Sequence, residues 1–189
     1  MDVSIRPATA KDAEKIADIY VASVSTLCTK DYTNEQIEII ACLHDAESYR
    51  EAIESNNIKI FLAVAKEVVG FASILIDEWK IGDLFILPNF TRQGIATRLL
   101  NAVEKYALQA QIYKLSVTAS LTARPFYSAC GYKYVRDSLI AEKIETVEMT
   151  KPLSQFGNSR NSKRYRNPNV ITLRDCIKFT IGLLFGKSV

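Results

Sequence analysis

The residues most capable of chemistry in this sequence lie between positions 84 and 100. An apolar run at 84–87 leads through Pro88 into a short loop with one glycine, Gly94, and then into a helix-forming segment. The first amide groups of a helix have no partner within it, and the helix dipole is positive at that end, so this arrangement binds phosphate. The residues predicted to hold the phosphate are Arg92, Gln93, Gly94, Ile95, Ala96 and Thr97.

The segments that must position this loop are predicted from hydrophobic spacing and helix start signals. Thr9 followed by Asp12, and Thr33 followed by Gln36, each have the spacing of a capping box. The patterns predict strands at 3–7, 58–65, 68–76, 80–87, 114–118, 132–135 and 146–149, and helices that begin near positions 10, 34, 46, 95 and 123. A helix between two strands implies a crossover and a parallel pair. We therefore expect a mixed α/β fold with a central, largely antiparallel sheet flanked by helices.

Composition limits the remaining function classes. The chain has 189 residues, of which 48% are apolar, which suffices for one domain of about 150 residues and an extension. The four cysteines show no paired spacing and His44 is the single histidine, so neither a disulfide framework nor a metal site is predicted. Because the first residues lack an apolar signal core, a cytoplasmic location is expected.

The C-terminal extension differs in charge from the rest of the chain. Residues 154–189 contain seven Lys or Arg and one acidic residue, a net charge of +6, so the total of +3 leaves −3 on residues 1–153. The main domain therefore has no basic surface that predicts a specific nucleic acid partner. We expect a polar linker at 154–169 and an amphipathic helix at 170–189. Two interpretations stay open: the helix docks on its own domain or on a second subunit in a homodimer, or it makes a weak contact with anionic lipid.

Three segments carry a family resemblance. Residues 84–100 resemble the acyl-CoA-binding segment of the GNAT acetyltransferase superfamily, residues 123–132 resemble its Ala-x-x-Phe-Tyr-x-x-x-Gly-Tyr segment, and residues 5–12 are similar to its usual start. The resemblance covers about residues 3–152 and implies an N-acetyltransferase domain at 1–153. It implies acetyl-CoA as co-substrate, no metal, and a primary amine of a small molecule or a protein as acceptor.

Two positions depart from the family pattern. Thr91 stands where the family usually has a longer polar side chain, and Ser120 stands where it often has Asn. We expect Arg92 to replace the missing phosphate contact, because a guanidinium matches phosphate oxygens. Ser120 keeps the ability to donate one hydrogen bond.

Acyl transfer from a thioester to an amine needs an extended pantetheine arm, a polarised carbonyl, a neutral amine and a protonated leaving thiolate. The strand at 84–87 offers main-chain groups to the arm, and an N–H near Phe85 or Ile86 is expected to polarise the carbonyl. Gly94 lets the ligand approach closely where a Cβ would obstruct it. With the resemblance, Tyr127 is expected to be the general acid that protonates the sulfur. Its alternative role is that of a core tyrosine.

The general base is less well defined by the sequence. Asp83, beside the central strand, is the first candidate, and Asp77, Glu78 and His44 follow. Each also fits a solvated surface group, and ordered water could serve in place of a single base. The resemblance implies that the first two helices and the turn near 77–80 line the acceptor site. An aromatic and acidic lining there would favour a cationic amine, but Tyr20 and Trp79 fit packing residues equally well, so the acceptor stays open. The residues expected there include Tyr20, Thr26, Asp31, Tyr32, His44 and Trp79.

Two functions remain open from the sequence. The first is an acetyltransferase that works by direct attack, because the sequence contains no Cys/His nucleophile arrangement. The second is a non-catalytic acyl-CoA-binding module that is recruited through its basic tail.

Overall fold

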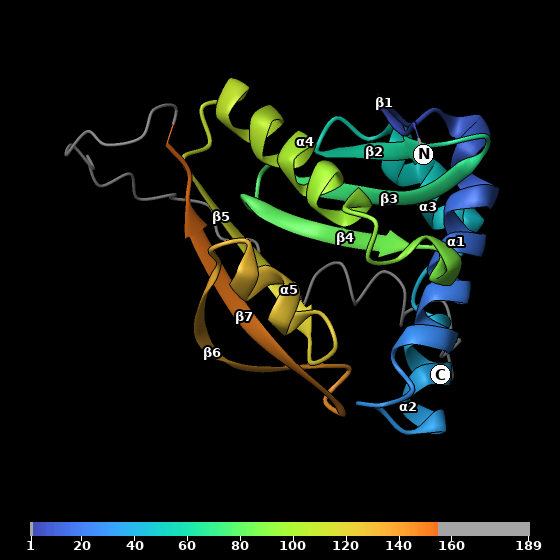
Figure 1. Cartoon of the computed structure of the whole chain (residues 1–189). Coiled ribbons are helices and arrows are strands. Elements are labelled where there is room, and N and C mark those ends of the chain that lie inside the picture. The colour runs from blue at the N-terminus through green and yellow to red at the C-terminus, as the bar shows by residue number, and fades with distance from the viewer. Residues whose placement is uncertain (1, 155–189) are drawn as a thin grey trace, which may run out of the picture. The chain divides into compact units, whose positions relative to one another are not determined.

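The computed structural model describes residues 2–154, which lie within one compact unit. The predicted linker beyond Ser154 and the predicted helix at 170–189 lie outside the described residues. The described strands form one sheet of seven in the order β1-β2-β3-β4-β5-β7-β6 (Figure 1). They are β1 (Ser4–Pro7), β2 (Ile58–Val64), β3 (Val68–Leu75), β4 (Lys80–Ile86), β5 (Lys114–Ser120), β6 (Lys133–Ile140) and β7 (Ile144–Pro152). The helices are α1 (Ala13–Leu27), α2 (Asn34–Ala41), α3 (Ala46–Glu54), α4 (Ile95–Gln109) and α5 (Arg124–Ala129).

The sheet confirms the predicted mixed α/β class. β2, β3 and β4 form the expected antiparallel meander, and α4 carries the chain over to β5, which runs parallel to β4. The last two strands are longer than predicted. β6 is an edge strand whose large apolar residues are exposed, so it lacks the alternation of a half-buried strand.

The helix start signals act as the sequence predicts. At α2, the Gln36 N–H donates to Thr33 Oγ1 at 3.3 Å and the Thr33 N–H donates to Gln36 Oε1 at 3.0 Å. At the first helix, the Thr9 N–H donates to the Asp12 carboxylate at 2.8 Å, but the box opens a short 3-10 turn (Ala10–Asp12) that precedes α1. Arg6 also pairs with Asp12 through two hydrogen bonds, and this pairing holds the pKa of Asp12 well below its usual range.

Two hydrophobic cores hold the central strands from opposite faces. α4 packs on one face, where Leu99, Leu100 and Val103 are buried against β3 and β4. α1 and α3 pack on the other face, where Tyr20 and Phe71 are buried (Figure 1). β4 is covered on both sides, so the segment that leads into the predicted phosphate loop has a fixed position.

Candidate active site

β4 and β5 separate soon after they meet. Their parallel pairing comprises Lys80 with Ser116 and Ile81 with Val117, and it ends there. β4 remains paired with β3 as far as Ile86, while β5 pairs with β7 as far as Ser120. The second half of β4 therefore directs main-chain groups toward a side that has no strand partner among residues 2–154, as the resemblance implies.

The hydrogen-bond alternation identifies which groups these are. The Leu87 N–H donates to the Val69 carbonyl at 2.9 Å. Because opposed residues in an antiparallel pair alternate between bonded and non-bonded, Phe85 points its N–H and C=O toward β3, and Ile86 points them away. The Ser23 hydroxyl, from α1, lies 2.9 Å from the Ile86 carbonyl oxygen, in agreement with this direction. Of the two predicted amides, that of Ile86 faces the diverging side.

The loop before α4 leaves the first amides of the helix without a helical acceptor. Gly94 caps α4 with a φ of +76°, and Arg92 has a φ of +58°. The first amide to find a helical acceptor is that of Arg98, which donates to the Gly94 carbonyl at 3.1 Å. The amides of residues 95–97 therefore have no acceptor within the helix. Apart from its chain neighbours, no atom of the described residues would lie within 4 Å of a Cβ on Gly94, so there is open space at the start of α4.

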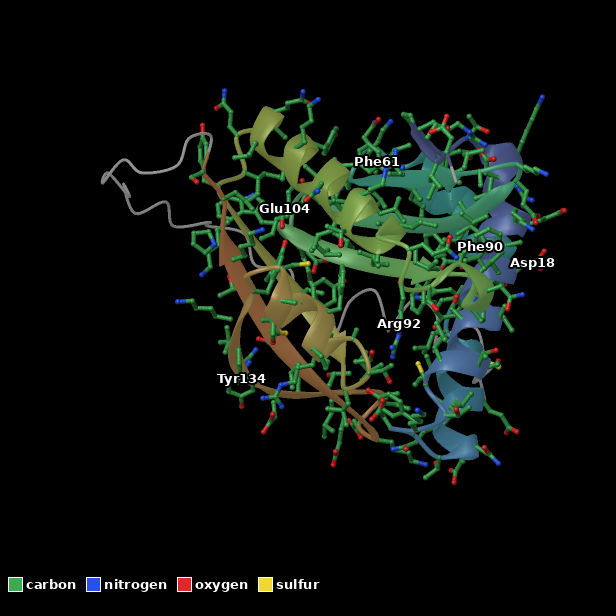
Figure 2. All side chains as sticks on the ribbon, in the orientation of Figure 1. Asp18, Phe61, Phe90, Arg92, Glu104 and Tyr134 are labelled. Atoms are coloured by element: carbon green, nitrogen blue, oxygen red, sulfur yellow. The ribbon has the colours of Figure 1, made fainter. Side chains whose placement is uncertain are left out.

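Most polar side chains of the loop and of the first turn of α4 form hydrogen bonds with the backbone, and one does not. The Thr91 hydroxyl donates to the Pro88 carbonyl at 2.9 Å, and the Gln93 amide donates to the Asn89 carbonyl at 3.2 Å. Arg98 donates to the carbonyl of Val3. Arg92 is exposed and forms no hydrogen bond or ion pair within residues 2–154, and Figure 2 shows its side chain extending from the loop. Arg92 is therefore the cation of this loop that remains available to a phosphate.

Tyr127 lies on α5, between the sheet and solvent. Its side chain is buried, and its ring centroid lies 5.5 Å from that of Tyr132. Its hydroxyl has no hydrogen-bond partner within residues 2–154. It differs from Thr146 Oγ1, which lacks a hydrogen-bond partner there and is also shielded from solvent. Burial raises the pKa of Tyr127, and the negative charge of Asp83 raises it further. The phenol is therefore protonated at neutral pH and lies within electrostatic reach of Asp83.

Asp83 is placed by an irregularity in the sheet. Ala72 pairs with Leu84 and Ile74 pairs with Ile81, so Ser73 faces two residues of β4, Gly82 and Asp83. The Asp83 N–H donates to Ser73 Oγ at 2.7 Å. A larger residue in place of Gly82 is not tolerated easily, because a Cβ there would lie 2.5 Å from Ser73 Oγ.

The environment of the Asp83 carboxyl changes its acidity. Burial raises its pKa, while the charge of His44 and hydrogen bonds from Tyr49 and Ser73 partly oppose that increase. The Tyr49 hydroxyl lies 3.5 Å from Asp83 Oδ2, a long contact. A carboxylate with a raised pKa is a stronger base toward an ammonium group.

Aromatic rings surround this carboxyl on the α1 and α3 side of the sheet. Ring centroids lie 4.9 Å apart for Tyr20 and Phe85, 5.3 Å apart for Tyr20 and His44, and 5.6 Å apart for His44 and Tyr49. Tyr20 and His44 were expected in the acceptor wall, but Tyr49 was not. The nearest local signal is the capping box of Asp45 and Ser48, which starts α3 just before Tyr49 but does not specify which face of the helix is buried.

Other predicted wall residues take different positions. Trp79 packs against the core on the α4 side, away from this aromatic group. Tyr32 connects the segment before α2 to the sheet. Its hydroxyl accepts from the Leu121 N–H at 2.9 Å, just after β5, and donates to the Glu145 carbonyl at 2.7 Å, near the start of β7. The Ser120 hydroxyl oxygen accepts from the Ala123 N–H at 3.1 Å and so shapes the turn into α5.

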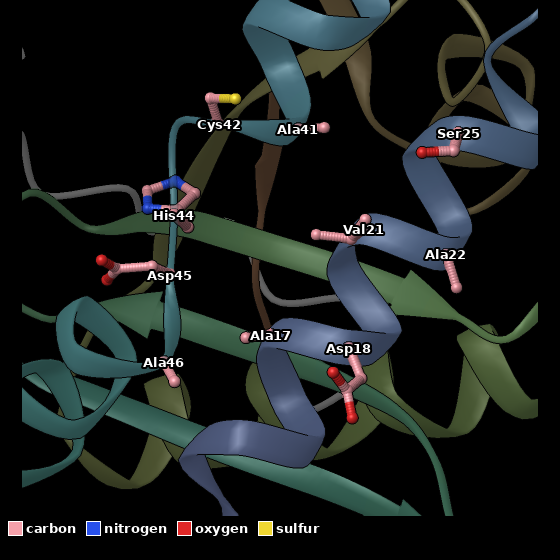
Figure 3. A pocket seen from close by; sticks show the side chains of 10 residues that line it. All are labelled: Ala17, Asp18, Val21, Ala22, Ser25, Ala41, Cys42, His44, Asp45 and Ala46. Atoms are coloured by element: carbon pink, nitrogen blue, oxygen red, sulfur yellow. The ribbon is translucent and has the colours of Figure 1, made fainter.

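A shallow hollow of about 680 Å³ opens between α1 and residues 41–46 (Figure 3). Its walls are mainly small and apolar, with Asp18, His44 and Asp45 as the charged or titratable side chains besides Cys42. Residues 2–154 contain no cluster of three side chains suited to a metal ion. None of the helices in the described part of the chain has the length and apolar character needed to span a bilayer.

The sheet divides between β4 and β5, and a glycine-capped helix follows β4, which is the arrangement that the resemblance to the GNAT acyltransferases implies. The family model for the acetyltransferase (GNAT) domain matches residues 28–153, and the chain belongs to this family. The comparisons thus confirm the resemblance seen in the sequence.

Relatives of known sequence and structure agree with this assignment. The uncharacterized N-acetyltransferase YafP of Escherichia coli (strain K12) is 27% identical over 139 residues, which cover 74% of this chain and 87% of that protein. The crystal structure of a GCN5-related N-acetyltransferase from Rhodopseudomonas palustris has a TM-score of 0.75 and 28% identity, and covers 81% of this chain and 97% of that one. The PaiA N-acetyltransferase of Thermoplasma acidophilum, solved in complex with coenzyme A, has the same fold, with a TM-score of 0.70, 24% identity, and coverage of 80% of this chain and 99% of that one.

Proposed function

We propose that this acyltransferase moves the acetyl group of acetyl-CoA to a primary amine by direct attack, with both substrates bound at once. One observation carries the proposal: beside the point where β4 and β5 separate, a protonated phenol, Tyr127, and a half-buried carboxyl, Asp83, lie within electrostatic reach of each other. The coenzyme A complex of the PaiA relative supports the choice of donor.

Each residue of the candidate site has its own role in the proposed reaction. The amides of residues 95–97, with Arg92, hold the diphosphate of the donor, and β4 aligns its pantetheine arm. Asp83 takes a proton from the ammonium, and the neutral nitrogen forms a bond to the thioester carbon. The Ile86 amide stabilises the oxyanion. When the carbon–sulfur bond breaks, Tyr127 gives its proton to the sulfur. The attached nitrogen then loses its second proton to the Tyr127 phenolate, and the products are an N-acetylated amine and coenzyme A, with one proton left on Asp83.

A covalent route through cysteine has less support. The thiolate is the nucleophilic form of cysteine, and burial raises the pKa of both Cys28 and Cys130. Neither thiol is therefore activated, and direct attack by the amine needs no such group.

The surroundings of Asp83 favour a cationic amine as acceptor. The carboxyl stands among the rings of Tyr20, Tyr49 and Phe85, and aromatic faces attract ammonium groups as carboxylates do. This lining suits a primary amine that arrives as an ammonium ion. It would repel an acceptor that presents a carboxylate at the same place.

The test measures thiol release from acetyl-CoA with four amines: ethanolamine, phenethylamine, spermidine and a short peptide with a free N-terminus. At least one amine should give turnover. Tyr127→Phe should then lower kcat by about 10²- to 10⁴-fold with little change in Tm, because the hydroxyl forms no hydrogen bond within residues 2–154. Tyr113→Phe, at a tyrosine that is 48% exposed, is the control and should retain full activity.

Two results would contradict the proposal. If acetyl-CoA raises Tm but no amine releases thiol, the protein is a non-catalytic acyl-CoA-binding module. If Tyr127→Phe keeps full turnover, the general acid is a different group.

A further inference from the structure

The proposed reaction uses the Tyr127 hydroxyl twice, first to protonate the sulfur and then to receive a proton from the nitrogen. The hydroxyl must therefore keep one position relative to the bound donor. Its own helix cannot ensure this, because α5 has only six residues. A helix of that length is not stable by itself, so contacts with other elements must hold it.

Tyr132 contacts Tyr127 through both its backbone and its ring. The Tyr132 N–H donates to the Tyr127 carbonyl at 3.0 Å, and between them Gly131, with a φ of +88°, turns the chain at the end of α5. The two rings meet edge to face, with centroids 5.5 Å apart and an interplanar angle of 71°. Both side chains are buried in a close-packed core, so a shift of one ring displaces the other.

The other end of the Tyr132 side chain is anchored by an ion pair. Its hydroxyl donates to Glu104 Oε1 at 3.1 Å. Lys151, from β7, donates to Oε1 and Oε2 of the same carboxylate at 2.8 and 2.9 Å, and its Nζ lies 5.5 Å from the centroid of the Tyr132 ring. Two short charge-assisted bonds fix the orientation of the carboxylate, so the Tyr132 hydroxyl has an acceptor in a fixed place.

Glu104 belongs to the helix that is proposed to bind the donor. α4 runs without interruption from Ile95 to Gln109, so Glu104 lies about 14 Å along the helix axis from Ile95. The Glu104 side chain extends from α4 toward the half of the sheet that contains β7 (Figure 2). One helix therefore connects the amides of residues 95–97 with the anchor of Tyr132.

Stability alone is a weak reason for this ion pair. The side chains of Glu104 and Lys151 are 14% and 26% exposed. Removing two charges from water offsets most of their attraction, so apolar side chains of similar volume would stabilise the fold as well or better. What the pair supplies is a defined geometry, and through Tyr132 that geometry reaches the ring of Tyr127.

Resting on the proposed function, we propose that Tyr132 is a positioning residue, held by Glu104 and Lys151, that keeps the Tyr127 hydroxyl in place relative to a donor bound at the start of α4. Loss of this link would leave both substrates bound and the phenol displaced. A displaced acid slows the chemical step, so kcat should fall while the KM values stay nearly constant.

The experiment measures thiol release from acetyl-CoA with the amine of the panel that reacts fastest. Tyr132→Phe keeps the ring beside Tyr127 and removes only the hydroxyl, and Glu104→Ala removes the acceptor of that hydroxyl. Each should lower kcat by about tenfold and change both KM values less than twofold. When either is combined with Tyr127→Phe, kcat should fall less than twofold further, because the hydroxyl that the network positions is already absent.

Two variants serve as controls. Tyr134→Phe makes the same change at a tyrosine that is 48% exposed, and it should match wild type. Glu104→Gln keeps an oxygen that accepts the Tyr132 hydroxyl, so it should retain more of the wild-type kcat than Glu104→Ala. Thermal unfolding of every variant records its stability separately from its turnover.

Two outcomes would overturn the positioning role. A wild-type kcat in both Tyr132→Phe and Glu104→Ala means that other contacts hold Tyr127. An equal further loss of kcat with and without Tyr127→Phe means that the network serves the fold alone. Failure of the proposed function has a different pattern, in which wild type releases no thiol or Tyr127→Phe keeps full turnover, and the positioning role then falls with it.

Discussion

Replacement of Gly94 by alanine separates the backbone role of this glycine from its role beside a ligand. Gly94 has a φ of +76°, and Gly131, in the turn after α5, has a φ of +88°. A Cβ on Gly94 would meet no protein atom within 4 Å, and one on Gly131 would lie 3.7 Å from Lys151 Cε, an ordinary contact. Both substitutions therefore carry the same left-handed backbone penalty and neither adds a clash.

That penalty sets the expected stability loss. The left-handed conformation costs a residue with a Cβ about 1–2 kcal/mol. In a domain of this size, each kcal/mol lowers Tm by about 2–4 °C. Gly94→Ala and Gly131→Ala should both lower Tm by about 2–8 °C, as measured by thermal unfolding without ligand.

Binding should distinguish the two variants. The open space beside Gly94 is where the donor diphosphate would approach the helix amides, so a methyl group there would hold it away. We expect the Kd of acetyl-CoA, measured by titration calorimetry, to rise at least tenfold in Gly94→Ala, which corresponds to about 1.4 kcal/mol, and less than twofold in Gly131→Ala. An unchanged Kd in Gly94→Ala beside an equal loss of Tm in both variants would refute a phosphate site at this loop.

Three further variants test other parts of the reasoning. Asp83→Asn should raise Tm at pH 8 and not below pH 4. The pKa of the half-buried Asp83 is raised, so its ionisation destabilises the fold, by about 1.4 kcal/mol for every tenfold increase in proton affinity; Tm measured against pH checks the sign. Arg92→Ala should raise the Kd of acetyl-CoA about three- to tenfold, with a smaller effect at high salt and an unchanged Tm, since the side chain is exposed and unpaired within residues 2–154. Leu99→Ala, at a fully buried position of α4, should lower the unfolding free energy in urea by about 2–5 kcal/mol.

The features that the sequence predicts well are local ones. The capping pair of Thr33 and Gln36 involves residues three apart, and the loop that starts α4 is a continuous segment that ends in Gly94. Short-range patterns of this kind appear directly in the order of the residues. The family resemblance placed Tyr127 in the same way, because its motif is continuous.

The features that the sequence did not predict depend on contacts between distant segments. Tyr49 reaches Asp83 from 34 positions away, and Ser23 reaches the Ile86 carbonyl from 63 positions away. No local pattern specifies such a contact, since it follows from how α1 and α3 pack on the sheet. The length of β6 was missed for a related reason: an edge strand needs no apolar alternation, so its sequence has no strong period.

The position of Asp83 shows how one irregular pairing controls the candidate chemistry. In a regular strand, Asp83 would share a face with Ile81, which packs on the α4 side. Because Gly82 and Asp83 together face Ser73, the side-chain order shifts by one residue, and Leu84 takes the face of Ile81 instead. Asp83 then joins Phe85 on the side of the aromatic rings. The bulge thus separates the carboxyl from the α4 core and places it on the side of Tyr49 and His44. A substitution elsewhere that restored regular pairing would leave Asp83 in the sequence but turn its side chain to the other face, so the proposed base would be lost from the site.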